Sequence, residues 1–121
     1  MLEDWYRVEQ VIEAWAALAG DSSPTERRRY EVGLALLRIM RELPSFQALE
    51  PFLSHNGLCL AYPLQPRTVV VRPADSDVFR VSLYDSRNLQ RPAVSSVYVP
   101  PGDVIPTVLH LLRPTSVGPE R

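Results

Sequence analysis

The clearest change in the spacing of apolar residues along this chain of 121 residues lies close to residue 57. Before that position, apolar side chains recur every three or four residues, as they do on one face of an α-helix. From there to about residue 99 they alternate with polar side chains, as they do in a strand that buries one face. This change from the helical to the strand period predicts an α+β fold, in which helices cover one face of a sheet.

Two long helices are predicted in the N-terminal part, over residues 2–19 and 24–43. Gly20 favours the end of the first helix, and the sequence from Ser23 to Glu26 matches a capping box at the start of the second. Because the connection between them is short, they are expected to form an antiparallel hairpin. The apolar faces comprise Trp5, Val8, Val11, Ile12, Trp15, Leu18 and Ala19 in the first helix, and Val32, Leu36, Ile39, Met40 and Leu43 in the second.

Three consecutive arginines, Arg27 to Arg29, open the second helix. Successive residues of a helix are rotated by about 100°, so these side chains do not form one basic patch. Two ion pairs at a spacing of four residues are predicted on the exposed face, Arg27 with Glu31 and Arg38 with Glu42. The arginine run is therefore interpreted as part of a solvated helix face.

A short third helical segment is predicted over residues 46–55, with Ser45 as its cap and Asn56–Gly57 as its end. Beyond it, runs of β-branched and aromatic residues separated by turn residues predict strands. Four strands are expected, at 58–62, 67–72, 78–84 and 94–99.

The strand connections are short, which favours an antiparallel meander. Asp103 is predicted to cap a last helix that ends near residue 113. We therefore expect one α+β domain over residues 1–113: a helical hairpin and a short helix packed on a four-stranded antiparallel sheet, with a C-terminal helix. Residues 114–121 are expected to be a disordered tail.

The composition excludes several classes of function. The single cysteine, Cys59, rules out an internal disulfide, and because all 13 basic residues are arginine, there is no lysine to form a Schiff base. A net charge of −1 is not that of a protein that binds nucleic acid through its overall charge. The N-terminus is acidic and no apolar run has membrane-spanning length, so a cytoplasmic protein without membrane contact is expected. The missing lysine and the 12 prolines fit a GC-rich genome, and selection against lysine is the alternative.

The residue sets that carry catalysis or bind metals are not evident in the sequence. His55 and Cys59 are four residues apart, but Cys59 lies in the apolar segment LCLAY, where a cysteine is usually a small buried hydrophobe. The other histidine, His110, has no metal-ligand spacing to His55. The aspartates between the strands are interpreted as turn residues. No enzymatic activity, cofactor or metal is therefore expected.

The alternation in residues 78–84 points to one sheet face as a recognition surface. If Phe79, Val81 and Leu83 face the helices, the residues between them face away. Tyrosine and arginine carry much of the binding energy in protein interfaces. A solvated sheet face with ordinary cross-strand pairs is the alternative. The predicted partner-binding residues are Arg72, Arg80, Tyr84 and Tyr98, with Thr68, Val70, Ser82 and Ser96 on the same face.

These observations favour a small non-catalytic module that binds another protein, as an adaptor, an inhibitor, an immunity-type protein or a chaperone-like regulator of bacterial or viral origin. An alternative is nucleic-acid binding by the same face, with Arg72 and Arg80 on phosphates and the tyrosines stacked under bases. A further alternative is a structural subunit that self-associates into a homodimer through the helix bearing Trp5 and Trp15.

Overall fold

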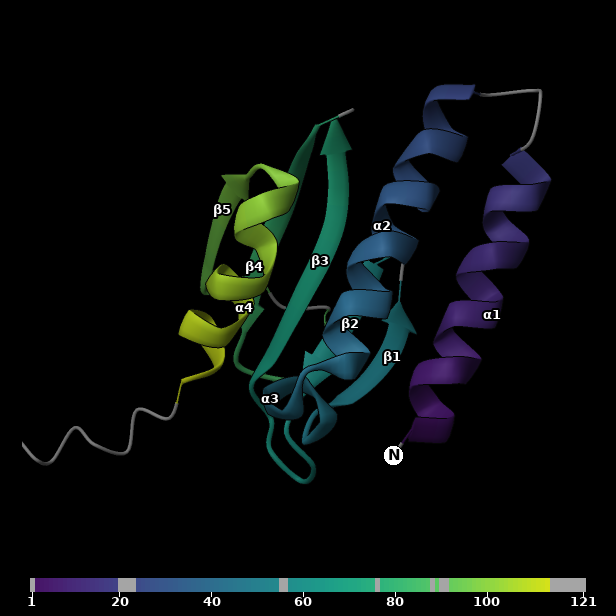
Figure 1. Ribbon diagram of the computed structural model, residues 1–121. Coiled ribbons are helices and arrows are strands. Elements are labelled where there is room, and N and C mark those ends of the chain that lie inside the picture. The colour runs from purple at the N-terminus through teal and green to yellow at the C-terminus, as the bar shows by residue number, and fades with distance from the viewer. Residues whose placement is uncertain are drawn as a thin grey trace, which may run out of the picture.

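Two antiparallel helices, a five-stranded sheet and a short C-terminal helix make up the computed structural model (Figure 1). It describes residues 2–19, 24–54, 57–75, 77–87, 89 and 92–113. The helices are α1 (Leu2–Ala19), α2 (Pro24–Glu42), α3 (Pro44–Gln47), the 3-10 helix η2 (Pro101–Asp103) and α4 (Val104–Leu112). The strands are β1 (Glu50–Ser54), β2 (Gly57–Ala61), β3 (Thr68–Asp75), β4 (Val78–Tyr84) and β5 (Ser95–Val99). Some predictions fall outside the described residues, namely those on Gly20, Ser23, His55, Asn56, the tail 114–121 and the side chains of Trp15, Leu18, Ala19 and Glu26.

The apolar faces of α1 and α2 pack against each other and against the sheet. In α1, Trp5 and Ile12 are buried, as predicted. In α2 the buried stripe is rotated from the predicted one, because Leu34 and Leu37 are buried whereas Ile39 is exposed. The reason is that α2 lies between α1 and the sheet and buries two adjoining faces rather than one (Figure 1).

An ion network joins α1 to α2. The Nε of Arg38 donates to Glu9 at 2.6 Å, and its Nη2 donates to Glu13 at 2.8 Å. Arg41 also donates to Glu9, which is buried between the helices. The predicted pair of Arg38 with Glu42 is wrong, because Arg38 reaches across to two acids of α1 instead of along its own helix.

The arginine run at the start of α2 points in several directions, as predicted. Arg27 and Arg28 are exposed, whereas Arg29 is half-buried. The Nε of Arg27 donates to Glu31 at 3.2 Å, which confirms the predicted pair, and Arg28 lies 4.0 Å from a carboxylate oxygen of Asp77. The run therefore does not form a single basic patch.

The sheet is an antiparallel meander in the order β1-β2-β3-β4-β5, and it has five strands rather than the predicted four. The additional strand, β1, lies within the predicted helix over 46–55, of which only the part in α3 is helical. Ser54 pairs with Gly57, so two residues join β1 to β2. A two-residue connection is typical of a β-hairpin, and Pro51 prevents the segment from continuing as a regular helix.

Smaller differences concern the ends of elements. β3 continues to Asp75 with an irregularity after Pro73, beyond the predicted end of this strand at residue 72. Asp103 precedes α4 but makes no side-chain capping bond. Instead, the Thr107 hydroxyl donates to the Asp103 carbonyl at 2.6 Å.

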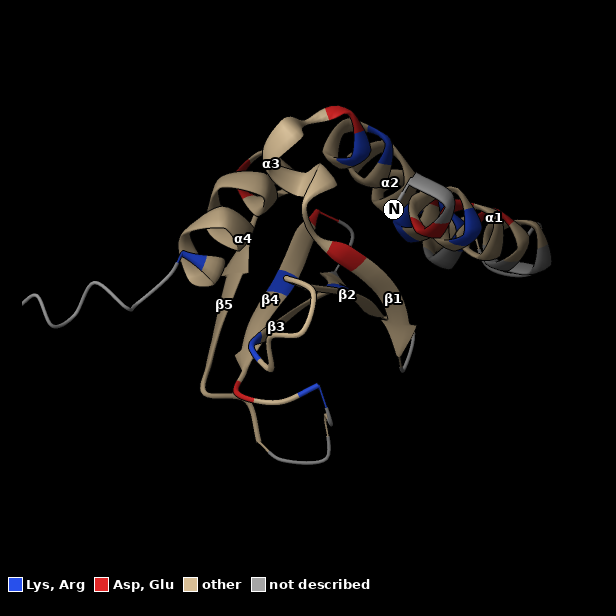
Figure 2. Ribbon diagram, turned by 90° about the horizontal axis from the view of Figure 1, so that it is seen from below, with Lys and Arg blue, Asp and Glu red and all other residues tan. Residues whose placement is uncertain are grey.

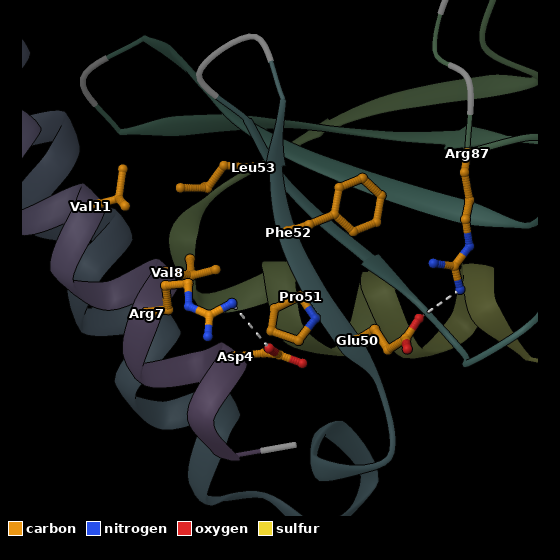
Figure 3. A pocket seen from close by; sticks show the side chains of 9 residues that line it. All are labelled: Asp4, Arg7, Val8, Val11, Glu50, Pro51, Phe52, Leu53 and Arg87. Carbon is orange, nitrogen blue, oxygen red and sulfur yellow. Dashed lines mark ion pairs between the residues drawn. The ribbon is translucent and has the colours of Figure 1, made fainter.

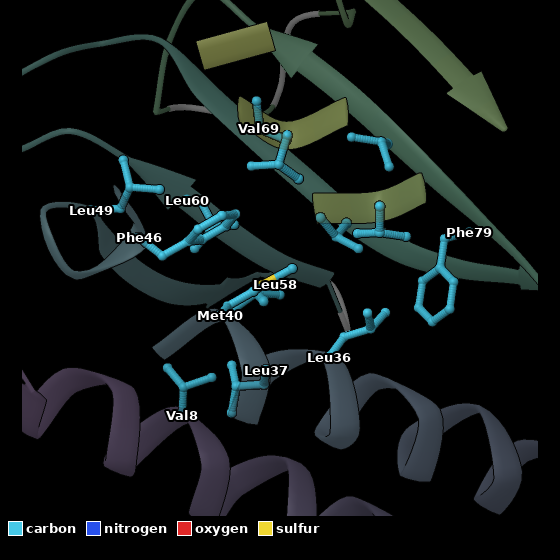
Figure 4. Packing of buried hydrophobic residues seen from close by; sticks show 14 of the residues in the cluster. Val8, Leu36, Leu37, Met40, Phe46, Leu49, Leu58, Leu60, Val69 and Phe79 are labelled. Atoms are coloured by element: carbon cyan, nitrogen blue, oxygen red, sulfur yellow. The ribbon is translucent and has the colours of Figure 1, made fainter. Parts of the chain in front are cut away.

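The helices cover one face of the sheet, as predicted. Phe79 and Val81 of β4 are buried beside Val69 and Val71 of β3, and α2, α3 and α4 contribute to the same core (Figure 4). Other members of this core are Leu36, Leu37, Met40, Phe46, Leu49, Leu58, Leu60, Val104 and Val108. None of the described helices lies on the opposite sheet face, which is therefore the face on which a recognition surface is sought.

The turn between β2 and β3 holds Leu64 in a left-handed conformation, with φ of +65°. The Gln65 amide donates to the Tyr62 carbonyl at 3.1 Å, so Leu64 takes the third position of a tight turn, where glycine is preferred. Its side chain is 97% exposed and stabilises nothing by burial. We expect Leu64→Gly to raise the free energy of unfolding by about 0.5 to 1 kcal/mol, because it removes the steric cost of positive φ. Urea unfolding followed by circular dichroism measures this, and Leu64→Ala, which keeps the Cβ, is the control expected to show no gain.

Candidate functional site

The strand register brings three of the four predicted binding residues into one row. Arg72 of β3 is opposite Arg80 of β4, and Arg80 is opposite Tyr98 of β5. Directly opposed residues share a sheet face, so all three lie on the face without helices. Tyr98 is 64% exposed, and both arginines are half-buried. The three residues share the predicted face, but the expectation that this whole face is open is wrong, because Thr68, Val70 and Ser82 on it are buried. Its exposed part is at β5.

Tyr84, the fourth predicted binding residue, is only 8% exposed. It packs with Cys59 and Val70 in a second, smaller apolar cluster, which Leu89 and Ala93 of the β4–β5 connection also contact. Figure 2 shows the described residues of this connection on the side of the sheet away from the helices. The expectation that Tyr84 is exposed is wrong, because Leu89 and Ala93 pack over its cluster and shield it from solvent.

Arg87 holds this connection in place. Its Nη2 donates to the Tyr62 carbonyl at 2.7 Å and lies 2.9 Å from a carboxylate oxygen of Glu50. Its Nε donates to the Gln65 carbonyl at 2.9 Å, and its guanidinium lies 6.0 Å from the centre of the Phe52 ring. The sequence contains no signal for this role, since the acceptors come from β1 and from the β2–β3 turn.

Arg72 is packed along the sheet. A methyl group at Gly57 would lie 3.0 Å from the Cγ and Nε of Arg72 and 2.8 Å from a methyl of Val70. Glycine at this position thus leaves room for the arginine stem. The Nε of Arg80 is buried and has no hydrogen-bond acceptor in the described part of the chain. Arg72 is therefore packed into the face, whereas Arg80 is half-buried beside β5.

Cys59 is fully buried in the second cluster, in agreement with its interpretation as a small hydrophobe. Burial raises the pKa of its thiol to about 11, although the nearby positive charge of Arg72 lowers it slightly. The thiol is therefore protonated at neutral pH and is a poor nucleophile. Among the residues that the structure describes, no three His, Cys, Asp or Glu side chains are placed to hold a metal ion.

A groove of about 480 Å³ lies between α1 and β1 (Figure 3). Val8, Val11 and Phe52 give it an apolar lining. Its charged groups are paired with one another, Asp4 with Arg7 at 3.8 Å and Glu50 with Arg87 at 2.9 Å. Because these charges already have partners, the groove lacks the convergent free polar groups that orient a small ligand.

The two edges of the sheet differ in their protection. At the β1 edge, α1 packs beside the strand and Pro51 removes one backbone donor (Figure 1). β5 has the sequence SSVYV, without proline or charge, and all of its residues are exposed except the half-buried Val99. Val97 is 40% exposed and the preceding Val94 is 56% exposed. Charged residues, prolines and covering elements normally block strand edges, so β5 is the unprotected edge of this sheet.

Comparison with known proteins yields no relative. No family model, no curated protein and no solved structure matches this chain. In the described residues, no helix combines the length and apolar character that crossing a bilayer requires. Function must therefore be inferred from the arrangement of residues alone.

Proposed function

We propose that this protein is a small non-catalytic protein-binding module whose contact surface is the edge strand β5 with Arg80 beside it. The main support is an uncharged strand edge on which Val97 and Tyr98 are exposed. A strand added to this edge would pair with the outward backbone groups of β5, while tyrosine and arginine side chains give specificity. The single buried free cysteine fits a reducing compartment, and we propose a cytoplasmic adaptor, inhibitor or chaperone-like regulator.

Protein binding is favoured over nucleic-acid binding by the burial of Tyr84. Stacking of successive bases needs several accessible aromatic rings along a basic groove. On this face Tyr98 remains as the exposed tyrosine, and Arg72 is packed against Gly57. This arrangement suits one aromatic anchor in a protein interface better than a platform for bases.

Affinity capture from an extract of the source cells tests this function. The double variant Val97→Lys/Tyr98→Ala should lose about ten-fold or more of a protein that the wild type retains, because it charges the edge and removes the aromatic anchor. Leu64→Ser is the matched control, since it alters an exposed apolar residue elsewhere and should retain the same protein. Quantitative mass spectrometry of the captured proteins gives the comparison, after circular dichroism has established that both variants are folded. Equal retention of every captured protein by the double variant would disprove the assignment of β5.

A further inference from the structure

We infer that the partner of β5 is a second copy of this chain, which adds its own β5 in antiparallel orientation about Val97 and joins the two sheets. This inference rests on the proposed function, because both use the same strand edge. A row of free backbone donors and acceptors is satisfied best by another extended strand. The choice of a second copy follows from the sequence of β5, the placement of charges and the character of α4.

The sequence of β5 is suited to antiparallel pairing with itself. Pairing about Val97 sets the two Val97 side chains against each other and places Ser95 opposite Val99 of the second copy. On the other face it places Tyr98 opposite Ser96 of the second copy. The small serine leaves room for the tyrosine ring, and its hydroxyl is already 2.9 Å from the Ser82 hydroxyl within its own sheet. The contact between the two Val97 side chains lies on the two-fold axis, and each of the other contacts occurs twice, as an interface with two-fold symmetry requires.

Charge does not oppose this pairing. β5 contains no ionisable group other than the Tyr98 phenol, as Figure 2 also shows for acids and bases. Arg80 is one strand further in, so three strand spacings separate it from Arg80 of the second copy, which is about 14 Å. This distance exceeds the screening length of about 10 Å at moderate ionic strength. Like-charge repulsion between the two sheets is therefore small.

α4 adds apolar surface near the end of the strand. Its sequence, VIPTVLHLL, contains no acid, lysine or arginine, and it follows β5 through η2 and packs on β3 and β4 (Figure 1). Ile105, Leu109 and Leu111 are only half-buried. A helix with apolar residues on most of its faces is normally covered on more than one side. Two short strands and the apolar residues beside them bury a small area compared with most stable interfaces. We therefore expect a dimer with a dissociation constant of about 1 to 100 μM.

Solution mass as a function of concentration tests the dimer. Sedimentation of the full chain from about 1 μM to about 1 mM should show a mass that rises from monomer to dimer. Val97→Lys should weaken the dimer about ten-fold or more, because it brings two ammonium groups together at the symmetry axis. Leu64→Lys introduces the same charge at an exposed site outside β5, in the β2–β3 turn, and should leave the dimer unchanged. A wild-type chain that remains monomeric throughout, or a dimer that Val97→Lys does not weaken, would overturn the inference.

Cross-linking tests the register. The native Cys59 is buried and its thiol stays protonated, so an introduced cysteine is the reactive one. Val97→Cys should form a covalent dimer with a short thiol cross-linker, since the two side chains face each other. Ser95→Cys should not, because pairing about Val97 sets residue 95 opposite residue 99 of the second copy. Efficient cross-linking of Ser95→Cys without that of Val97→Cys would contradict this register.

The outcomes separate this inference from the proposed function. A monomeric chain that still captures a protein through β5, and loses it in Val97→Lys/Tyr98→Ala, would overturn self-pairing and leave the binding module intact. A β5 dimer that captures no other protein supports self-pairing, with the second copy as the bound partner. A dimer that persists unchanged in Val97→Lys overturns self-pairing through β5, and unchanged capture by the double variant overturns the proposed function.

Discussion

Trp5→Ala is expected to lower the free energy of unfolding by about 3 to 5 kcal/mol. Trp5 is fully buried, and its ring meets Phe46 edge to face with 6.5 Å between the ring centres. The substitution removes the largest buried side chain among the described side chains of α1 and leaves a cavity between the helical hairpin and α3. Because domains of this size are stable by only about 5 to 15 kcal/mol, a large part of the total is lost. Urea or guanidinium unfolding followed by circular dichroism measures the change.

Trp5→Phe separates ring packing from hydrogen bonding. The indole Nε1 of Trp5 is buried and has no acceptor among the residues described. Phenylalanine keeps an aromatic contact with Phe46 and removes this unpaired donor, so we expect a loss of less than about 2 kcal/mol. Tyr6→Ala is a neighbouring control at a half-exposed site, where the ring lies under Arg41 at 4.6 Å, and should cost at most about 1 kcal/mol. A Trp5→Ala cost no larger than that of Tyr6→Ala would contradict the central place of Trp5 in the core.

Glu9→Gln is expected to lower the free energy of unfolding by about 2 kcal/mol at neutral pH, because it removes a buried carboxylate that accepts from Arg38 and Arg41. Burial raises the pKa of Glu9, but the hydrogen bonds and charges of these two arginines outweigh it and hold the pKa below 4.5. A carboxyl with a lowered pKa in the folded state stabilises the protein above its unfolded pKa and loses this contribution as pH falls through the folded pKa. The difference in the free energy of unfolding between wild type and Glu9→Gln should therefore reach its maximum above pH 4.5 and decrease at lower pH.

Unfolding curves of both proteins at about pH 7 and about pH 3 measure this dependence. Glu13→Gln is the matched control on the same helix. Its carboxylate accepts from Arg38 at 2.8 Å but is half exposed, so the substitution should cost less than about 1 kcal/mol. If Glu13→Gln proved as costly as Glu9→Gln, burial of Glu9 would not be the reason for its contribution.

Elements with an unambiguous period were predictable from local sequence. The predicted bounds of α1 and β4 agree with Leu2–Ala19 and Val78–Tyr84, because each element faces the core with a regular set of apolar residues. The segment 46–55 was not predictable in this way, since its apolar residues fit both periods. Its end at Asn56–Gly57 is compatible with a helix stop and with a hairpin, and only the pairing of β1 with β2 distinguishes them.

The candidate surface was likewise predictable from the sequence only in part. Alternation along β4 was enough to predict that Arg80 faces away from the helices, and the register extends this to Arg72 and Tyr98. Alternation says nothing about what covers that face. Tyr84 has the same parity as Arg80 in the strand, yet it is buried by Leu89 and Ala93.

The sequence by itself determined the α+β class, the order of most helices and strands, and the side of the sheet on which each residue of β4 lies. These features depend on residues two to four positions apart, which interact wherever the chain goes. Only the tertiary structure decided that Tyr84 is covered, that Arg87 holds the cover to Glu50 and Tyr62, and that β5 is the open edge. Exposure depends on contacts between segments distant in sequence. The local spacing of apolar residues does not indicate which of these segments will come into contact.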